Sequence, residues 1–258
     1  MGLKTILLPL LFLAACANPL SPGKHRIAKI PEASGICYDT SRNTLFVVSD
    51  RGIVFELSTD GKILRKRHLG HYDLEGIACD PGQQMLYAAV EGKDNILLID
   101  THTLHIKKEV SIKRSFRGEK LLLKDKEYGL EGITLSANGK LLFLSNQSRH
   151  KYPRNDPSVI VIVKRDDLKK SKAEISGFID PRKTDIAGLA YRNGFLYMVS
   201  DSKNRLYRYN FKTKKIDLKR KLPKFAQEGI TFDDRGNLYL TDDNGAVLKY
   251  RTEDFGIR

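Results

Sequence analysis

Acidic residues recur at fixed places in this sequence, beside a short motif that ends in glycine and isoleucine. The motif reads Glu-Gly-Ile at Glu75, Glu131 and Glu228. Five further candidate ligands stand beside other copies or at the end of a later apolar stretch: Asp73, Asp185, Glu32, Asp50 and Asp201. Carboxylates crowded at one place repel one another unless a cation lies between them. Oxygen ligands, without His or Cys at metal spacing, favour Ca²⁺ over Zn²⁺.

The same acids allow a second interpretation without a metal. A glutamate at the start of a strand can accept hydrogen bonds from backbone N–H groups and fasten the start of each repeat. Both interpretations require the chain to bring the motif copies to one place.

The motif occurs five times, and its spacing predicts the fold. Its glycines are separated by 41, 56, 56 and 41 residues: Gly35, Gly76, Gly132, Gly188 and Gly229. Each copy runs into two apolar stretches joined by a polar turn, which is typical of a β-hairpin, and two further stretches follow in most repeats. Repeats of this length indicate propeller blades. We predict an all-β protein, a five-bladed β-propeller of four-stranded antiparallel blades, with six blades as the alternative.

The last repeat lacks a fourth apolar stretch before Arg258. The segment from Arg26 to Ile30 precedes the first motif and can supply that strand. We therefore expect the N-terminal segment to complete the last blade, which closes the ring and removes an open sheet edge.

Strand direction predicts where the acids lie. The first strand of each blade starts on one face of the ring, and the second strand returns to that face. The motif acids and the acids that end second strands, such as Asp50, Glu91 and Asp201, therefore ring one mouth of the central channel. The two longer repeats carry insertions at about residues 113–128 and 147–157, and both fall on this face.

The insertions carry basic and aromatic residues. We predict that four of them bind a small anionic ligand above the cation: Arg149, His150, Tyr152 and Arg117. Long loops in a compact repeat fold are often functional. Solvated surface loops are the other interpretation.

The N-terminus predicts export. Lys4 precedes a short apolar run, and Leu13-Ala14-Ala15 leads into Cys16, as in a bacterial lipobox. We predict a signal peptide over residues 1–15, lipidation of Cys16 with palmitate or a similar acyl chain, a tether over 16–23 and a propeller domain over 24–258. No Asp follows Cys16, which favours the outer membrane, facing the periplasm. An ordinary signal peptide is the alternative.

Composition narrows the partners. Lys and Arg number 45 against 31 Asp and Glu, a formal net charge of +14. No aromatic-interleaved basic motif indicates nucleic-acid binding, so an anionic lipid or cell-wall surface is the better match, and we expect a monomer. Cys37 and Cys79 occupy non-equivalent repeat positions, so we expect free, buried thiols rather than a disulfide.

With the repeats aligned, the chain resembles the SdiA-regulated family of bacterial exported proteins, distant relatives of NHL-repeat propellers. The resemblance rests on the motif copies at residues 32–36, 73–77, 129–133 and 227–230, and on strands that end in Ser-Asp. It implies a five-bladed propeller with bound Ca²⁺ and no established activity. Ser34 and Ala187 replace the glutamate in two copies, so the metal site should be lopsided.

Two functions fit these expectations. The first is a lipid-anchored envelope module that binds a ligand or an envelope protein at its acid-lined face. The alternative is a Ca²⁺-dependent hydrolase of lactonase, esterase or phosphoesterase type. Only His71 and His150 fall near that mouth, and no Gly-x-Ser-x-Gly motif occurs. The binding function is therefore preferred.

Overall fold

The computed structural model describes residues 20–122 and 129–257. The predicted signal peptide and Cys16 lie outside the described residues. Within the described part, no helix has both the length and the apolar character needed to span a membrane.

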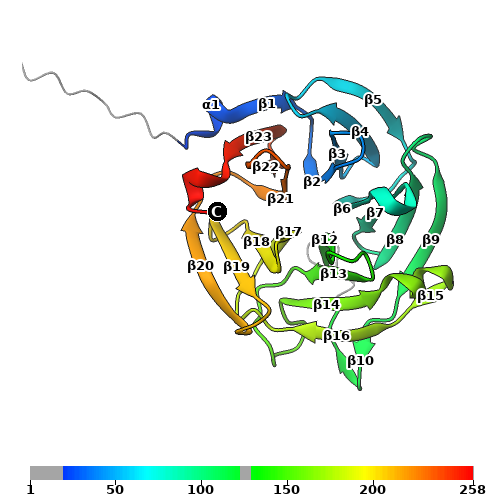
Figure 1. Cartoon of the computed structure of the whole chain (residues 1–258). Coiled ribbons are helices and arrows are strands. Elements are labelled where there is room, and N and C mark those ends of the chain that lie inside the picture. Colours follow the sequence, from blue (N-terminus) through cyan, green and yellow to red (C-terminus); the bar gives the residue numbers. More distant parts are fainter. Residues whose placement is uncertain (1–19, 123–128, 258) are drawn as a thin grey trace, which may run out of the picture.

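Five four-stranded antiparallel sheets stand around a central axis as the blades of a propeller (Figure 1). Listed from the axis outwards, the strands are β2(Ala33–Asp39), β3(Thr44–Ser49), β4(Ile53–Ser58) and β5(Ile63–His68) in blade one; β6(Leu74–Asp80), β7(Met85–Val90), β8(Asn95–Asp100) and β9(Ile106–Ile112) in blade two; β12(Leu130–Leu135), β13(Leu141–Asn146), β14(Val159–Lys164) and β16(Ile175–Ile179) in blade three; β17(Ile186–Arg192), β18(Phe195–Ser200), β19(Arg205–Asn210) and β20(Lys215–Lys221) in blade four; and β21(Gln227–Phe232), β22(Asn237–Asp242), β23(Ala246–Arg251) and β1(Arg26–Lys29) in blade five. The predicted five blades are confirmed, and the six-bladed alternative is excluded.

The remaining elements are short. A helical turn, α1(Pro22–His25), leads into β1, and three 3₁₀ turns follow strands at Pro81–Gln83, Arg165–Lys169 and Thr252–Phe255. The first insertion forms a small hairpin of β10(Ser115–Phe116) and β11(Glu119–Lys120). β15(Lys172–Ala173) pairs in parallel with β9 of the preceding blade and links blades two and three.

The ring closes through its N-terminal strand, as predicted. β1 pairs antiparallel with β23, with Arg26 opposite Leu248 and Lys29 opposite Ala246. Figure 1 shows β1 outside β23, in the position that the outermost strand fills in the other blades. This pairing covers the edge of β23 that a linear array would leave open.

The motif glycines sit where neighbouring inner strands touch. A Cβ on Gly76 would lie 2.3 Å from the carbonyl oxygen of Glu131 in the next blade. The same position in the last blade, Gly229, would meet the carbonyl oxygen of Ser34 at 2.8 Å, so the ring of contacts runs from blade five back to blade one. Only glycine permits such backbone approach without displacing the neighbour.

Every inner strand also has a β-bulge or register shift at its motif. In blade two the pairing with β7 shifts between Leu74 and Ile77, and the other four inner strands shift at the equivalent place. In two blades a hydroxyl fills the gap in the ladder: the N–H of Gly132 donates to Ser145 Oγ at 2.7 Å, and the N–H of Gly229 donates to Thr241 Oγ1 at 2.7 Å. A β-bulge changes the direction in which side chains point. In this propeller the bulges affect the side chain of the residue before each motif glycine.

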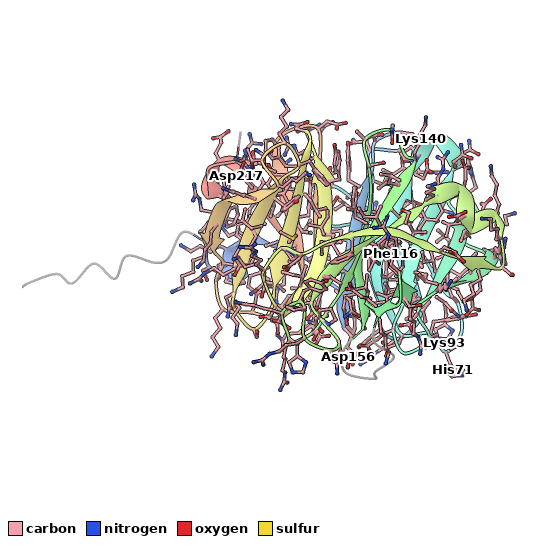
Figure 2. The ribbon with its side chains drawn as sticks, turned by 90° about the horizontal axis from the view of Figure 1, so that it is seen from below. His71, Lys93, Phe116, Lys140, Asp156 and Asp217 are labelled. Atoms are coloured by element: carbon pink, nitrogen blue, oxygen red, sulfur yellow. A yellow bond between two sulfur atoms is a disulfide. The ribbon has the colours of Figure 1, made fainter. Side chains whose placement is uncertain are left out.

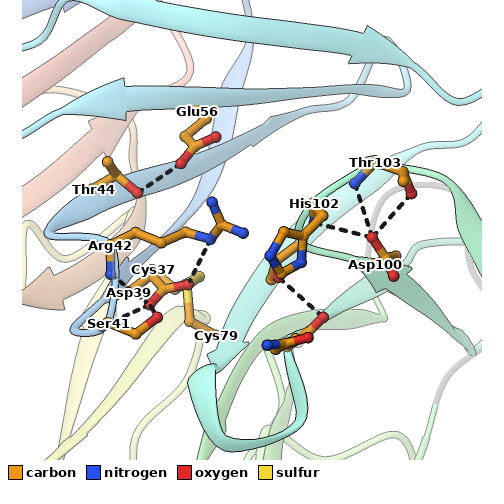
Figure 3. A network of polar contacts seen from close by, with 12 residues as sticks. Cys37, Asp39, Ser41, Arg42, Thr44, Glu56, Cys79, Asp100, His102 and Thr103 are labelled. Atoms are coloured by element: carbon orange, nitrogen blue, oxygen red, sulfur yellow. Dashed lines mark hydrogen bonds and ion pairs between the residues drawn. A yellow bond between two sulfur atoms is a disulfide. The ribbon is translucent and has the colours of Figure 1, made fainter.

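The expectation of free cysteines is wrong. Cys37 of β2 and Cys79 of β6 form a disulfide, with their Cα atoms 5.7 Å apart (Figure 3). It lies near the turn after β2, where the N–H of Ser41 donates to Asp39 Oδ1 at 2.9 Å. The bond joins two blades rather than two strands of one sheet. Equivalent repeat positions are therefore not required, and the argument from their non-equivalence fails.

The close contacts of the motif glycines predict that one added methyl group will strongly lower the stability of the fold. Gly76→Ala should lower the free energy of unfolding by roughly 1–3 kcal/mol or more, because its Cβ meets backbone atoms that cannot turn aside. Gly23→Ala is the matched control, since nothing lies within 4 Å of its added Cβ, and it should change stability by less than about 0.5 kcal/mol. Urea unfolding measures both. Equal stability of the two variants would contradict the close packing.

Candidate functional site

One face of the propeller collects most of the loops that the sequence predicted for it. Figure 2 shows His71, Lys93 and Asp156 along one edge of the disc and Lys140 along the opposite edge. His71 precedes β6, Lys93 precedes β8 and Asp156 precedes β14, whereas Lys140 lies in the turn before β13. The face where inner strands begin, called the acid face below, therefore carries the second insertion, whereas Phe116 of the first insertion lies midway between the two faces on the outside of the ring.

The three motif glutamates meet near the axis on the acid face. Glu131 is 5% exposed, and Glu75 and Glu228 are half-buried. Burial raises the pKa of all three carboxyl groups well above the ordinary value, and neighbouring negative charge adds to it. The charge of Glu228 raises the pKa of Glu75 further, and the charges of Glu75 and Glu228 raise the pKa of Glu131. The charges of Asp201 and Asp243 raise the pKa of Glu228.

The tightest group of carboxylates lies in blade two. One oxygen from each of Asp73, Glu75 and Glu91 can be chosen so that all three lie within 4.8 Å of one another. Glu91 was predicted on this face but left out of the ligand set. It directly follows β7, as Asp50 follows β3 and Asp201 follows β18. Because Glu91 occupies the same position in the repeat as Asp50 and Asp201, the sequence could have identified it as a candidate ligand.

Asp50 is poised to change its charge near neutral pH. Burial, followed by a hydrogen bond and charge from Glu32, raises the pKa of Asp50 to about 7. Its Oδ1 atom is buried and has no hydrogen-bond partner. An unpartnered buried carboxylate oxygen is costly in the absence of a positive neighbour.

Three other predicted ligands are already engaged in the fold. Arg51 forms an ion pair with Glu32 and lowers its pKa to about 2. Asp185 accepts a hydrogen bond from the N–H of Ser202 at 2.6 Å, and Asp201 accepts one from the N–H of Gln227 at 3.2 Å. These contacts match the structural interpretation of the acids. The motif glutamates, Asp73 and Asp50 match the cation-binding one.

Residues that suit a hard cation are thus present in one place. Carboxylate oxygens dominate: Asp73, Glu75 and Glu91 offer three within 4.8 Å of one another, and the Oδ1 atom of Asp50 is buried without a hydrogen-bond partner. This donor set fits Ca²⁺, which takes oxygen ligands in flexible arrangements.

The predicted ligand-binding residues of the insertions lie farther out. Tyr152 lines a cavity of about 530 Å³ between the second insertion and the β10–β11 hairpin. Arg117 lies over the ring of its neighbour Phe116 at 5.1 Å, and His150 Nδ1 is 3.2 Å from the carbonyl oxygen of Asn155 in its own loop. Arg149 is exposed. None of the acids at the axis lines this cavity.

A larger cavity, which the sequence analysis does not predict, lies at the other mouth of the channel. It measures about 850 Å³ and is lined by the ends of the inner strands, with Tyr38, Tyr191 and Phe232 among its walls. The aliphatic residues that follow the motif glycines also line it: Ile36, Ile77, Ile133, Leu189 and Ile230. These side chains are 4% exposed or less, and none of the acids at the opposite mouth contributes to the lining.

Comparison with known proteins agrees with this architecture. The model of the SdiA-regulated family matches residues 23–245. Among solved structures, the chain is similar to glutaminyl cyclase of Myxococcus xanthus, with a TM-score of 0.65 and 13% identity over 88% of this chain and 93% of that chain. It is also similar to hydrazine synthase of Kuenenia stuttgartiensis, with a TM-score of 0.50 and 15% identity over 83% of this chain and 56% of that chain. At these identities the likeness is one of fold alone.

No curated protein sequence matches the chain.

The acid face predicts an unusual dependence of stability on pH. Because folding raises the pKa of Asp50 from its ordinary 3.8 to about 7, the folded state binds a proton that the unfolded state has lost between about pH 4 and pH 7. With chelator present, urea unfolding should therefore show stability falling across this window. Asp50→Asn should make the fall shallower. Stability that rises steadily from pH 4 to 7 would contradict the arrangement.

Proposed function

The chain belongs to the SdiA-regulated family, and we propose that it is a lipid-anchored envelope module that binds Ca²⁺ at the acid face and offers this face to a ligand or partner. The observation that carries the proposal is the convergence of carboxylates on the acid face: oxygens of Asp73, Glu75 and Glu91 lie within 4.8 Å of one another, and burial and neighbouring acids raise the pKa values of Glu75, Glu131 and Glu228. A divalent cation would neutralise charge that the fold otherwise forces together.

Five carboxylates of blades two, three and five would hold the ion. Asp73, Glu75 and Glu91 offer three oxygens within 4.8 Å of one another, Glu131 belongs to the adjoining blade three, and Glu228 belongs to blade five. Ser34 and Ala187 supply no carboxylate at the equivalent positions of blades one and four. The site is therefore weighted towards blades two, three and five.

The lipid anchor is proposed from the Leu-Ala-Ala-Cys sequence that ends at Cys16. The disulfide between Cys37 and Cys79 supports export, because disulfides persist in oxidising compartments. The absence of Asp directly after Cys16 supports placement on the outer membrane, facing the periplasm.

A hydrolase is the second candidate. The observation that favours it is Asp50, whose carboxyl has a pKa of about 7 and an unpartnered buried oxygen. A carboxylate with that pKa can accept a proton from water and return it at neutral pH. The chain itself would contribute this proton transfer and the binding of an anionic or ester substrate, and Ca²⁺ would supply polarisation of the substrate.

Calcium should stabilise the protein measurably. At a free Ca²⁺ concentration one hundred times its Kd, the stabilisation is about 2.7 kcal/mol, which raises Tm by about 5–10 °C for a domain of this size. Glu75→Gln with Glu131→Gln should melt higher than wild type in chelator, because repulsion is relieved, and should lose the response to Ca²⁺. Thermal melting in Ca²⁺, in Mg²⁺ and in chelator measures this.

Asp217→Asn is the matched control for this experiment. Asp217 pairs with Arg208 on the outer strand of blade four, away from the acid face, so its variant should keep the full Ca²⁺ shift. If chelator leaves the wild-type Tm unmoved, the calcium proposal is wrong. Turnover of ester, lactone, phosphate-ester or N-terminal glutaminyl substrates that disappears in the glutamate variants would instead favour an enzyme.

Lipidation has its own test. Intact-mass measurement of protein extracted from a bacterial membrane fraction should show a chain that begins at Cys16 and carries added acyl mass. Cys16→Ser should move the protein to the soluble periplasmic fraction with its fold unchanged. A chain cleaved elsewhere, or a Cys16→Ser variant that keeps the acyl mass, would contradict the anchor.

A further inference from the structure

An outer edge of the ring, where blades five and one meet, carries exposed apolar and basic side chains that the acid face does not use. Ile63 and Leu64 begin β5 and are 44% and 49% exposed, and they are the large hydrophobic side chains that lie exposed in the described part of the chain. Most outward side chains of a propeller rim are polar, so two adjacent aliphatic residues stand out.

Basic residues surround this pair. Residues 20–30 and 58–68 contain seven Lys or Arg against one acid, Asp60. They are Lys24, Arg26, Lys29, Lys62, Arg65, Lys66 and Arg67. Asp60 pairs with Lys249 at 2.9 Å, and Arg65 pairs with the buried Glu56. In the described residues no salt bridge engages Lys24, Arg26, Lys29, Lys62 or Lys66.

The two segments form one continuous surface, which we call the basic edge. The turn between β4 and β5 packs against β1, since a Cβ on Gly61 would lie 2.1 Å from the carbonyl oxygen of Ile27. Lys249 Nζ donates to the carbonyl oxygen of Thr59 at 3.0 Å and ties this turn to β23 as well. Figure 1 shows β5 starting beside β1 on the outside of the ring.

The chain enters the fold at this same edge. The hydroxyl of Tyr250 donates to the carbonyl oxygen of Leu20 at 3.3 Å, and the His25 ring stacks on Tyr250 at 4.1 Å. Leu20 lies four positions after Cys16, and an extended chain spans at most ~3.6 Å per residue, or about 14 Å here. A lipid on Cys16, which is part of the function proposed above, would hold the bilayer within that distance of Leu20.

We infer that the basic edge docks on an anionic phospholipid surface, with Ile63 and Leu64 at the level of the headgroups. Each Lys or Arg close to such a surface strengthens binding about five-fold, and partly inserted aliphatic side chains add to it. A basic patch adds to the membrane binding that acylation provides.

Docking at this edge also orients the acid face. Tyr250 lies near the end of β23, which starts on the acid face at Ala246. Leu20, the turn at residues 59–61 and the start of β5 therefore lie toward the opposite face of the disc. Lys29 and Arg67 lie opposite Ala246 and Val54, toward the acid face, so the basic edge runs along the outside of the ring. Docking there places the bilayer beside the ring and leaves the channel mouth on the acid face open to a ligand or partner.

A vesicle experiment tests this surface without the lipid. The chain from residue 16 onward with Cys16→Ser is sedimented with phosphatidylcholine vesicles and with vesicles that also contain phosphatidylglycerol. We expect binding to the anionic vesicles alone, weakened by salt. Lys62→Glu with Lys66→Glu should weaken it by ten-fold or more. Lys164→Glu with Lys172→Glu, an exposed control pair on β14 and β15 where blades two and three meet, should leave it nearly unchanged.

Fluorescence adds a direct readout, because the sequence contains no tryptophan. Leu64→Trp provides a single reporter whose emission should shift to shorter wavelength when anionic vesicles are added. Lys164→Trp should show no shift. This readout separates contact of the basic edge with lipid from a general attraction of a basic protein to a negative surface.

Three results would overturn the inference. Equal weakening by the two charge-reversal pairs would mean that net charge alone drives binding. An unshifted Leu64→Trp spectrum in bound protein would place the contact elsewhere. Self-association that disappears in Ile63→Ser with Leu64→Ser, without any vesicle binding, would assign the edge to a second copy. None of these outcomes bears on Cys16 acylation or on Ca²⁺ melting shifts, so the proposed function fails or survives separately.

Discussion

At the axis of this propeller, five inner strands approach one another until the Cα of a glycine in one blade lies against the backbone of the next. A single added carbon at Gly76 would lie 2.3 Å from the carbonyl oxygen of Glu131. This contact fixes the backbone of the residue before each glycine, and the bulge in each inner strand re-aims its side chain. Where that residue is a glutamate, the same packing that closes the ring places its carboxylate near the axis.

Close packing therefore creates an electrostatic conflict in a protein whose overall charge is positive. The excess of Lys and Arg does not relieve it, because charges on the rim are screened beyond about 10 Å at ordinary ionic strength. Burial removes water from the same carboxyl groups and raises their pKa values further. Protonation or a bound cation resolves the conflict, and at neutral pH a divalent cation resolves it without leaving buried oxygens unpartnered.

Much of the fold was predictable from the sequence, because the length and strand order of a repeat determine the size of a blade and the face on which each loop lies. The glycine spacing predicts the blades, the missing fourth strand predicts closure by β1, and strand direction places the acids and the second insertion on one face. The disulfide was mispredicted because Cys37 and Cys79 join two blades, where repeat position does not determine distance. Glu91 was not predicted as a ligand, although it occupies the same repeat position as Asp50 and Asp201. The cavity lined by Tyr38, Tyr191 and Phe232 depends on the depth of the inner-strand ends, and no local sequence pattern encodes that depth.

The most direct test of the central claim is calorimetric titration of Ca²⁺ into chelator-treated protein, in two buffers of different ionisation enthalpy at slightly acidic pH. If Ca²⁺ binds among carboxyl groups that packing keeps protonated, binding must release protons. The apparent enthalpy will then differ between the buffers, and the affinity will rise with pH. No binding, or binding with the same enthalpy in both buffers and the same affinity at every pH, would contradict the account.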